Sequence, residues 1–231
     1  MLSVQGINQY FGASHTLRDV ELSVGGGRIF CLMGRNGVGK TTLLNTLLGL
    51  LPAQSGEISL AGERIDGLKT EDRVGRGIAY VPQGRMIFPD LTVMENLRVA
   101  LAGRRGGGTG VPEQVFEFFP VLAEMANRRG GDLSGGQQQQ LAIGRALVLE
   151  PRVLLLDEPC EGIQPNIVQL IGEVIQRLRS EQNLSVLLVE QKLPFARAVA
   201  DDFAIMDRGQ IVADGAMDQL SEELVAEYLT V

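Results

Sequence analysis

The feature that most limits the fold of this chain is a glycine-rich segment, Gly34-Arg35-Asn36-Gly37-Val38-Gly39-Lys40-Thr41, which fits the pattern G-x-x-x-x-G-K-[ST]. It lies between an apolar run and a helical pattern over Thr42–Leu50. In this setting, glycines let backbone N–H groups surround phosphate oxygens, and the helix N-terminus adds partial positive charge. Lys40 would reach the β- and γ-phosphates, and Thr41 offers a hydroxyl to Mg²⁺. Together with Thr42, the segment predicts a nucleoside triphosphate site rather than an ordinary turn before a helix.

The alternation of short apolar runs with helical patterns predicts an α/β fold. Near-continuous apolar runs are typical of central parallel strands that are covered on both faces. They are Arg28–Met33, Gly77–Val81, Arg152–Leu156 and Ser185–Val189. Runs with more alternation predict a half-exposed, peripheral antiparallel layer. These are Val4–Ile7, Leu17–Val24, Gly56–Leu60 and Gln210–Ala213.

A helical pattern occupies the middle of the chain, between Leu91 and Glu150. We expect one domain over residues 1–231, with a helical subdomain inserted at approximately 84–150. The glycine-dense stretch 104–110 has no apolar residue to anchor it and is interpreted as a mobile loop. The acidic stretch Ser221–Tyr228 predicts an amphipathic helix with a solvated face.

Composition excludes several classes of protein. The 231 residues carry 21 Lys and Arg against 28 Asp and Glu, a net charge of −7, which argues against binding to nucleic acid. Two cysteines provide no disulfide framework and favour a reducing compartment. We expect no cleaved leader, because the first residues lack a basic start followed by an apolar stretch. No apolar run approaches the roughly 18 residues that span a bilayer, so work at a membrane would need a membrane partner.

Two adjacent carboxylates, Asp157 and Glu158, follow the apolar run that begins at Val153. At the carboxyl edge of a parallel sheet, such a pair can hold Mg²⁺ and polarise a water molecule. Because side chains alternate along a strand, one carboxylate can serve the metal while the other addresses the attacking water. The alternative is a strand capped by solvated acids, which the phosphate-binding pattern disfavours.

A second candidate anion-binding turn is Leu133-Ser134-Gly135-Gly136-Gln137, which opens a predicted helix over Gln138–Leu149. One phosphate chain needs only one such turn, so the second one indicates a nucleotide held by another copy. The turn reads LSGGQ, the signature of the ATP-binding cassette (ABC) family. The chain resembles that family over essentially all of its 231 residues.

The resemblance implies the P-loop NTPase fold of ABC ATPases, with a parallel core sheet, an antiparallel β layer and an inserted helical subdomain. It implies ATP hydrolysis with ATP and Mg²⁺ as cofactors. Phe11 matches the aromatic residue that stacks on adenine, with Tyr10 as the alternative. Ser134, Gly135, Gly136 and Gln137 would act across a dimer interface on the ATP of the opposite subunit.

The same resemblance assigns catalytic roles. Glu158 is similar to the general base of the family, and Asp157 to the aspartate on the magnesium side. Gln83 matches the glutamine that links Mg²⁺ and water to the membrane partner, and Thr41 also faces the metal. Lys40 and Gln191 complete the catalytic set, Gln191 through the γ-phosphate.

Two departures from the family pattern affect these roles. Gln191 stands where the family has a switch histidine, and an amide can donate a hydrogen bond but cannot become cationic. Gln164 stands where many relatives have an aspartate, so communication across the dimer would rely on an amide or on backbone. The single histidine, His15, is expected on a surface loop.

Neither cysteine is expected to be reactive. Cys160 lies beside the carboxylate pair, but a thiol nucleophile needs a base such as histidine, and none is near in the sequence. We interpret it as a packing residue. Cys31, within an apolar run, is expected in the core.

The segment between Lys40 and Ser134 is too short for the coiled-coil arms of chromosome or repair cassettes, which favours a transport motor. The chain is similar to importer ATPases for branched-chain amino acids and, more closely, for urea. The matching stretches are residues 34–40, 81–89, 133–145 and 161–165. A soluble cassette with a regulatory or nucleic-acid-associated role is the alternative from another class.

An importer role implies specific partners. They are a second ABC ATPase subunit, two transmembrane permease subunits and, indirectly, an extracytoplasmic solute-binding protein, with no nucleic acid. The expected cassette pair is a heterodimer in the transporter, with a homodimer as the alternative for the isolated chain. The chain would lie in the cytoplasm, on the inner face of a bacterial plasma membrane. The surface near Gln83 and Leu91–Arg129 would receive the permease, and Met86, Ile87 and Phe88 suit either that contact or the core.

Overall fold

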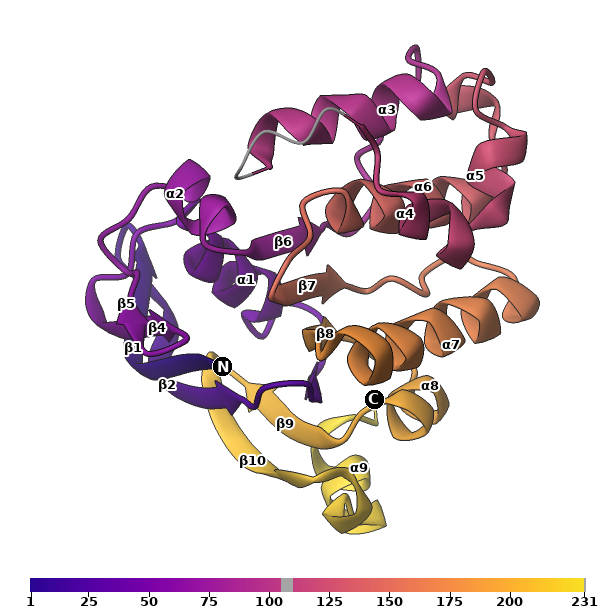
Figure 1. The fold of residues 1–231 in the computed structure, drawn as a ribbon. Coiled ribbons are helices and arrows are strands. Elements are labelled where there is room, and N and C mark those ends of the chain that lie inside the picture. The colour runs from indigo at the N-terminus through magenta and orange to yellow at the C-terminus, as the bar shows by residue number, and fades with distance from the viewer. Residues whose placement is uncertain (105–109, 231) are drawn as a thin grey trace.

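The computed structural model describes residues 1–104 and 110–230 (Figure 1). Most of the interpreted loop at 104–110 therefore lies outside the described residues. The centre is a six-stranded sheet in the order β10-β9-β3-β8-β7-β6. Its strands are β3 (Ile29–Met33), β6 (Ile78–Val81), β7 (Val153–Asp157), β8 (Ser185–Val189), β9 (Asp202–Asp207) and β10 (Gln210–Ala216). The four apolar runs predicted as parallel strands form β3, β6, β7 and β8, which confirms that prediction.

The second sheet has four antiparallel strands in the order β2-β1-β4-β5. They are β1 (Leu2–Phe11), β2 (Ser14–Val24), β4 (Ser55–Leu60) and β5 (Glu63–Arg64). The prediction of an antiparallel layer was right for three of its four runs and wrong for Gln210–Ala213. That run belongs to β10, which pairs antiparallel with β9 at the edge of the central sheet. Alternation of apolar and polar residues indicates that one face of a strand is exposed. Because an edge strand of either sheet can have one exposed face, the pattern does not tell which sheet the strand joins.

Helices follow the strands and cover the central sheet. They are α1 (Lys40–Leu48), α2 (Thr70–Gly75), α3 (Val93–Ala100), α4 (Glu113–Phe118), α5 (Pro120–Glu124), α6 (Gly135–Leu147), α7 (Pro165–Gln182), α8 (Leu193–Val199) and α9 (Glu222–Tyr228). Local signals explain where the longer ones begin. Thr92 and Glu95 form a capping box at α3, and Pro165 occupies the first turn of α7.

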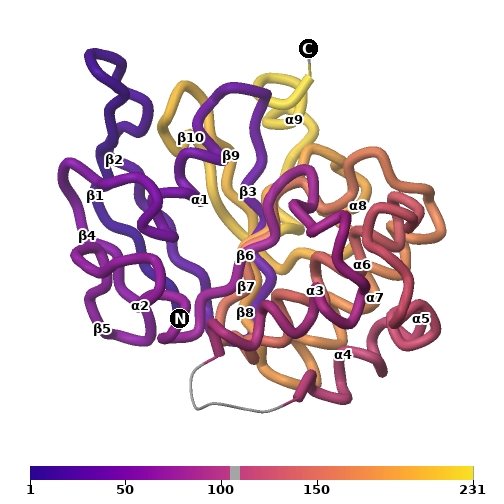
Figure 2. Tube along the Cα trace, turned by 90° about the horizontal axis from the view of Figure 1, so that it is seen from above, coloured from indigo at the N-terminus to yellow at the C-terminus, as the bar shows by residue number. Residues whose placement is uncertain are grey.

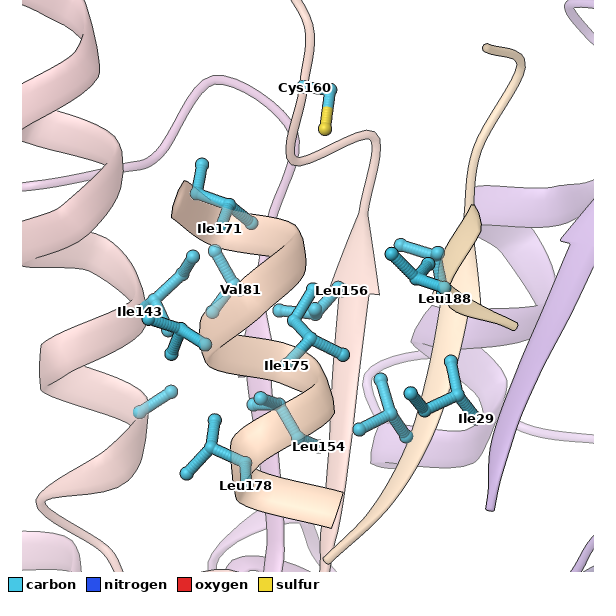
Figure 3. Packing of buried hydrophobic residues seen from close by; sticks show 14 of the residues in the cluster. Ile29, Val81, Ile143, Leu154, Leu156, Cys160, Ile171, Ile175, Leu178 and Leu188 are labelled. Atoms are coloured by element: carbon cyan, nitrogen blue, oxygen red, sulfur yellow. The ribbon is translucent and has the colours of Figure 1, made fainter. Parts of the chain in front are cut away.

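The apolar strands are buried on both faces because alternate residues enter two different cores. In β7, Leu154 and Leu156 join a cluster with α6 and α7, as Figure 3 shows. Val153 and Leu155 join a second cluster formed with α1 and the antiparallel sheet. The central sheet is therefore held rigidly between two layers, and the loops at its carboxyl edge are anchored on a fixed frame.

Figure 2 shows the two flanking regions on opposite sides of the central sheet, with β1, β2 and β4 on one side and α3 to α7 on the other. Between β6 and β7, the described residues form helices joined by loops. Within residues 1–104 and 110–230, no helix has the length and apolar character needed to cross a bilayer.

Candidate functional site

The glycine-rich segment forms the turn from β3 into α1, as its sequence predicts. Gly34 and Gly39 have φ values of 148° and 116°, and a Cβ atom at Gly34 would lie 2.3 Å from the carbonyl oxygen of Met206. Gly37 also has a positive φ, 79°. Only glycine adopts this path without strain, and such a path turns backbone N–H groups toward one point in front of the helix.

Lys40 is the first residue of α1, and its side chain folds back under the loop. Its Nζ atom donates to the carbonyl oxygens of Gly34 at 2.7 Å and Arg35 at 2.8 Å, and the residue is only 5% exposed. Burial lowers the pKa of the Lys40 ammonium, while the charges of Glu158, Asp157 and Glu190 oppose that shift. The loop therefore holds one cation at its centre, surrounded by carboxylates.

Asp157 ends β7 directly beside α1. Its Oδ2 atom accepts hydrogen bonds from the hydroxyls of Thr41 at 3.0 Å and Tyr80 at 3.3 Å. The side chain is buried, and its Oδ1 atom has no hydrogen-bond partner among the described residues. Burial raises the pKa of Asp157, although the two hydroxyls and the Lys40 ammonium act against the shift. The sequence analysis did not identify Tyr80 as a site residue. As one residue of an apolar strand, β6, it shows no pattern that would predict its contact with Asp157.

Glu158 follows directly after β7, and its backbone has a φ of 48°. The Nε2 atom of Gln191 donates both to Glu158 Oε1 and to Asn36 Oδ1, the latter at 2.7 Å. On the other side, Gln83 Nε2 donates to Glu158 Oε2 at 3.3 Å and to Glu161 at 3.0 Å. The structure thus brings Gln83, Glu158 and Gln191 together at the carboxyl edge of the sheet.

Glu190 is a second residue that sequence reasoning missed. It is 3% exposed, and its Oε1 atom accepts the backbone N–H groups of Gln191 at 2.8 Å and Lys192 at 2.9 Å. Both bonds fix the turn that presents the Gln191 side chain. Its position directly after the apolar strand β8 was the sequence signal that could have identified Glu190.

A cavity of about 200 Å³ opens in front of the phosphate loop. It is lined by Thr16, Asn36, Gly37, Gly39, Lys40, Thr41, Thr42, Gln83 and Glu158. Most of the residues predicted to touch a triphosphate thus face one space. Phe11, Gly34, Arg35 and Val38 do not line it. The guanidinium of Arg35 points to α9, and Val38 packs on the second core cluster.

The signature turn lies apart from this cavity, since none of its residues lines it. Ser134 caps α6 in a capping box, accepting the N–H of Gln137 at 3.3 Å while Gln137 Oε1 accepts the N–H of Ser134 at 2.9 Å. The serine and glutamine are exposed or half-exposed. A Cβ at Gly136 would come within 2.9 Å of Ile167, so the turn is packed against α7. The start of α6 is thus ordered and takes no part in the cavity in front of the phosphate loop of the same chain.

The aromatic residues at the end of β1 differ in their surroundings. Tyr10 stacks on His15 with ring centroids 4.1 Å apart, whereas Phe11 is 52% exposed. The expected surface loop at His15 was wrong in one respect, because His15 lies in β2, where its Nε2 atom contacts Asn8 Oδ1 at 2.9 Å. Of the two aromatic rings, Phe11 is the one that has no stacking partner in the described residues.

Both cysteines lie in the core, as expected. Cys31 and Cys160 are fully buried and form no disulfide. Burial raises the pKa of both thiols, and the charge of Glu190 adds to the shift. A thiol nucleophile at Cys160 is therefore disfavoured.

Comparison with known proteins assigns the family. The sequence profile described as ABC transporter matches residues 17–161, which include the phosphate loop, the signature turn and the carboxylate pair. The chain belongs to the ABC transporter family. It is 44% identical to the high-affinity branched-chain amino acid transport ATP-binding protein BraG of Pseudomonas aeruginosa, over 92% of this chain and 91% of that protein. It is 35% identical to a probable branched-chain amino acid transport ATP-binding protein, LivF, of Archaeoglobus fulgidus, over 99% and 98%.

Solved structures of cassettes have the same fold. A nucleotide-free ATP-binding cassette from an ABC transporter superposes with a TM-score of 0.85 at 28% identity, covering 98% of this chain and 97% of the other. A dimeric, post-hydrolysis cassette bound to ADP and phosphate superposes with a TM-score of 0.84 at 25% identity, covering 94% and 99%. The chain is an ABC transporter ATPase with the cassette fold, which confirms the fold class and the enzyme class predicted from the sequence.

Proposed function

We propose that this chain is the ATP-hydrolysing motor subunit of an importer in the branched-chain amino acid transport group. The observation that carries the proposal is one cavity lined by Lys40, Thr41 and Glu158, in a chain 44% identical to a branched-chain amino acid cassette. Asp157 accepts a hydrogen bond from Thr41, and Gln191 donates one to Glu158, directly behind this lining. Phosphate positioning and charge stabilisation are the main tasks of a protein that transfers a phosphoryl group.

The residues of the site divide the work of hydrolysis. The N–H groups of residues 37–42 and the Lys40 ammonium would hold the β- and γ-phosphates, and Phe11 would stack on the adenine. Glu158 would orient the attacking water and accept its proton. Gln191 donates both of its amide hydrogens, to the Glu158 carboxylate and to Asn36, and would donate to the γ-phosphate by exchanging one of these two bonds.

The residues present also fit Mg²⁺. Asp157 offers a buried oxygen that has no partner in the part of the chain that the structure describes, and the Thr41 hydroxyl donates to its other oxygen. Mg²⁺ is usually bound by one or two protein carboxylates together with phosphate oxygens and water. We propose that Thr41, Asp157 and Gln83 bind Mg²⁺ or lie next to it. When bound, Mg²⁺ would neutralise phosphate charge.

We propose that the working unit pairs two cassettes. In this chain, Ser134–Gln137 does not line the phosphate cavity, so its helix end is available to the nucleotide of a partner. Relatives named BraF and BraG in Pseudomonas aeruginosa, both branched-chain amino acid cassettes, match this chain at 33% and 44% identity, which supports two different cassettes in the transporter. Closure around ATP and opening after hydrolysis would supply the motion.

The proposed permease contact is a groove of about 420 Å³ next to Gln83. Met86 is 69% exposed and lines it together with Val99 and Ala100 of α3 and Ala142 of α6. Phe88 is 41% exposed and stacks under Arg145, while Ile87 packs on the core. We propose that transmembrane subunits dock here, with an extracytoplasmic binding protein on the other side of the membrane, which would place the chain on the inner face of a bacterial plasma membrane.

The solute is proposed from the relatives. BraG, LivF and BraF are all named as branched-chain amino acid transport proteins. Their similarity to this chain supports a branched-chain amino acid rather than urea as the principal candidate for the solute. Urea stays the second candidate because the sequences of residues 34–40, 81–89, 133–145 and 161–165 resemble those of urea importers.

Reconstitution separates these candidates. The chain would be purified with the permease, second cassette and binding protein encoded beside it, placed in proteoliposomes, and supplied with labelled leucine or labelled urea. We expect ATP-dependent uptake of leucine. Uptake of urea alone would support the second candidate, and failure of the chain to co-purify with any permease would favour a soluble cassette.

Substitution of Gln191 tests its proposed contact with the γ-phosphate. Because an imidazole can also donate there, Gln191→His should keep turnover within about threefold and add a step near pH 6–7 to the rate profile. The wild-type chain, measured in parallel, should lack that step. Loss of turnover in Gln191→His with normal ATP binding would show that the geometry requires the amide.

A further inference from the structure

Arg35 occupies a position that the phosphate-loop pattern leaves unspecified, and its side chain does not line the phosphate cavity. Its Nη2 atom donates to the backbone carbonyl oxygens of Glu227, at 3.5 Å, and Thr230. Leu229, between them, lines a second cavity of about 200 Å³ together with Gly34, Arg35, Asn36 and Gln191. The end of α9 is therefore in direct contact with the first residues of the phosphate loop.

This contact follows from ordinary helix chemistry. The last carbonyls of a helix have no partner within it, and a cation at that end is favoured by the helix dipole. Glu227 lies in the last turn of α9, where its carbonyl is such an acceptor, and Thr230 lies two residues past the end of the helix. An arginine can serve two carbonyls at once because its planar head carries several donors.

The other end of α9 is fixed as well, so the contact with Arg35 is not a loose tail. Arg197 of α8 donates to Glu222 at 2.7 Å and to the carbonyl of Leu220 at 3.2 Å. Ser221 caps the helix, and Val225 is buried in the main core cluster. In Figure 2, α9 lies beside β9 and β10, close to the end of the chain marked C.

The segment thus connects two parts of the catalytic site. The helix α8 begins two residues after Gln191, and α9 reaches from α8 to the phosphate loop. Within the loop, the Arg35 carbonyl accepts from Lys40, and the adjacent Asn36 side chain accepts from Gln191. The direction of the loop at residues 35 and 36 therefore decides where both Lys40 and Gln191 lie.

We propose that Arg35 is a positioning residue, and that residues 227–230 hold the phosphate loop, through the Arg35 guanidinium, in the conformation that accepts the triphosphate. The inference rests on the proposed nucleotide site but adds a part that the site does not contain. A loop already ordered before binding saves the ordering cost at the moment of binding. The contact should therefore affect affinity more than the chemical step.

A double-mutant cycle tests the proposal. Four chains are compared: wild type, Arg35→Ala, a variant that ends after Ala226, and both changes together. Calorimetry gives the dissociation constant for ATP with Mg²⁺, and steady-state hydrolysis gives kcat. We expect each single change to weaken ATP binding by roughly three- to tenfold, with kcat at saturation within about twofold. The combined variant should be no weaker than either single variant, because both remove the same contact.

Two further variants separate positioning from folding. Arg35→Lys should restore part of the affinity, since an ammonium can still reach one carbonyl. If the shortened chain folds poorly, Leu229→Asp takes its place in the comparison, because this substitution disturbs the packing of the same segment. It should weaken ATP binding by the amount expected for truncation. Arg64→Ala is the matched control, because Arg64 is an exposed arginine of β5 whose partners are Glu57 and Asp66.

Unchanged affinity in the shortened chain and in Leu229→Asp would overturn the proposal. The proposal would also be overturned if the losses of ATP affinity in the two single variants multiplied in the combined variant. That result would mean that Arg35 acts on the nucleotide itself and not through residues 227–230. Wild-type binding in the same titrations tests the proposed function separately: absence of wild-type binding would overturn both, whereas normal wild-type binding with unaffected variants would overturn only the role of Arg35.

Discussion

Glu158→Gln is expected to bind ATP and to hydrolyse it at least roughly 100-fold more slowly than the wild-type chain, because loss of a general base typically costs a factor of this size or more. The amide oxygen can still accept the hydrogen bond that Glu158 receives from Gln191, so the geometry of the site is kept. What is lost is the basicity that would take a proton from water. Phosphate release under single-turnover conditions measures the effect directly.

The neighbouring carboxylate makes this experiment decisive. Gln83 contacts Glu161 as well as Glu158, at 3.0 Å and 3.3 Å, so either group could in principle be the base. Glu161→Gln is expected to lower turnover by no more than about threefold, since it removes one exposed hydrogen-bond acceptor. If Glu161→Gln abolished hydrolysis and Glu158→Gln did not, the roles of the two residues would be reversed.

The same variant reports on the proposed pairing of cassettes. A chain that binds ATP without consuming it should stay closed on the nucleotide, and removal of one negative charge next to the γ-phosphate favours that state further. Light scattering should show Glu158→Gln as a dimer in ATP with Mg²⁺ and as a monomer without nucleotide. A monomer under both conditions would leave the signature turn at Ser134 without a partner.

The phosphate loop and the parallel strands were predictable because their signals are local. Gly34 and Gly39 need positive φ values that glycine tolerates, and β7 is an uninterrupted apolar run because both of its faces are buried. The LSGGQ turn was similarly readable, since a serine before two glycines and a glutamine forms a capping box from adjacent residues alone.

The features that sequence reasoning missed depend on contacts between distant segments. The strand β9 has four apolar residues between Asp202 and Asp207, and its place beside β3 in the central sheet depends on pairing with a segment far away in the sequence. The destination of the Arg35 side chain depends on a helix almost 200 positions further along the chain. Glu190 likewise gains its role from a turn that only the folded sheet creates.

Lys40→Ala is expected to weaken ATP binding by about 100-fold or more, since Lys40 would contribute charge-assisted hydrogen bonds worth roughly 1.5–3 kcal/mol each to the phosphates. In the structure its ammonium holds the carbonyls of Gly34 and Arg35, and the carboxylates of Asp157 and Glu158 raise its pKa against the effect of burial. Alanine would remove the only lysine among the residues that line the cavity. Calorimetric titration with ATP and Mg²⁺ measures the loss.

Lys69→Ala is the matched control, because Lys69 is an exposed lysine before α2 and lies outside the phosphate cavity. It should bind ATP as the wild type does. Denaturant unfolding of both variants separates a loss of affinity from a loss of folded protein. If Lys40→Ala remained folded and bound ATP as tightly as Lys69→Ala, the loop between β3 and α1 would not be the phosphate site, and the assignment of Thr41, Asp157 and Glu158 around it would fail with it.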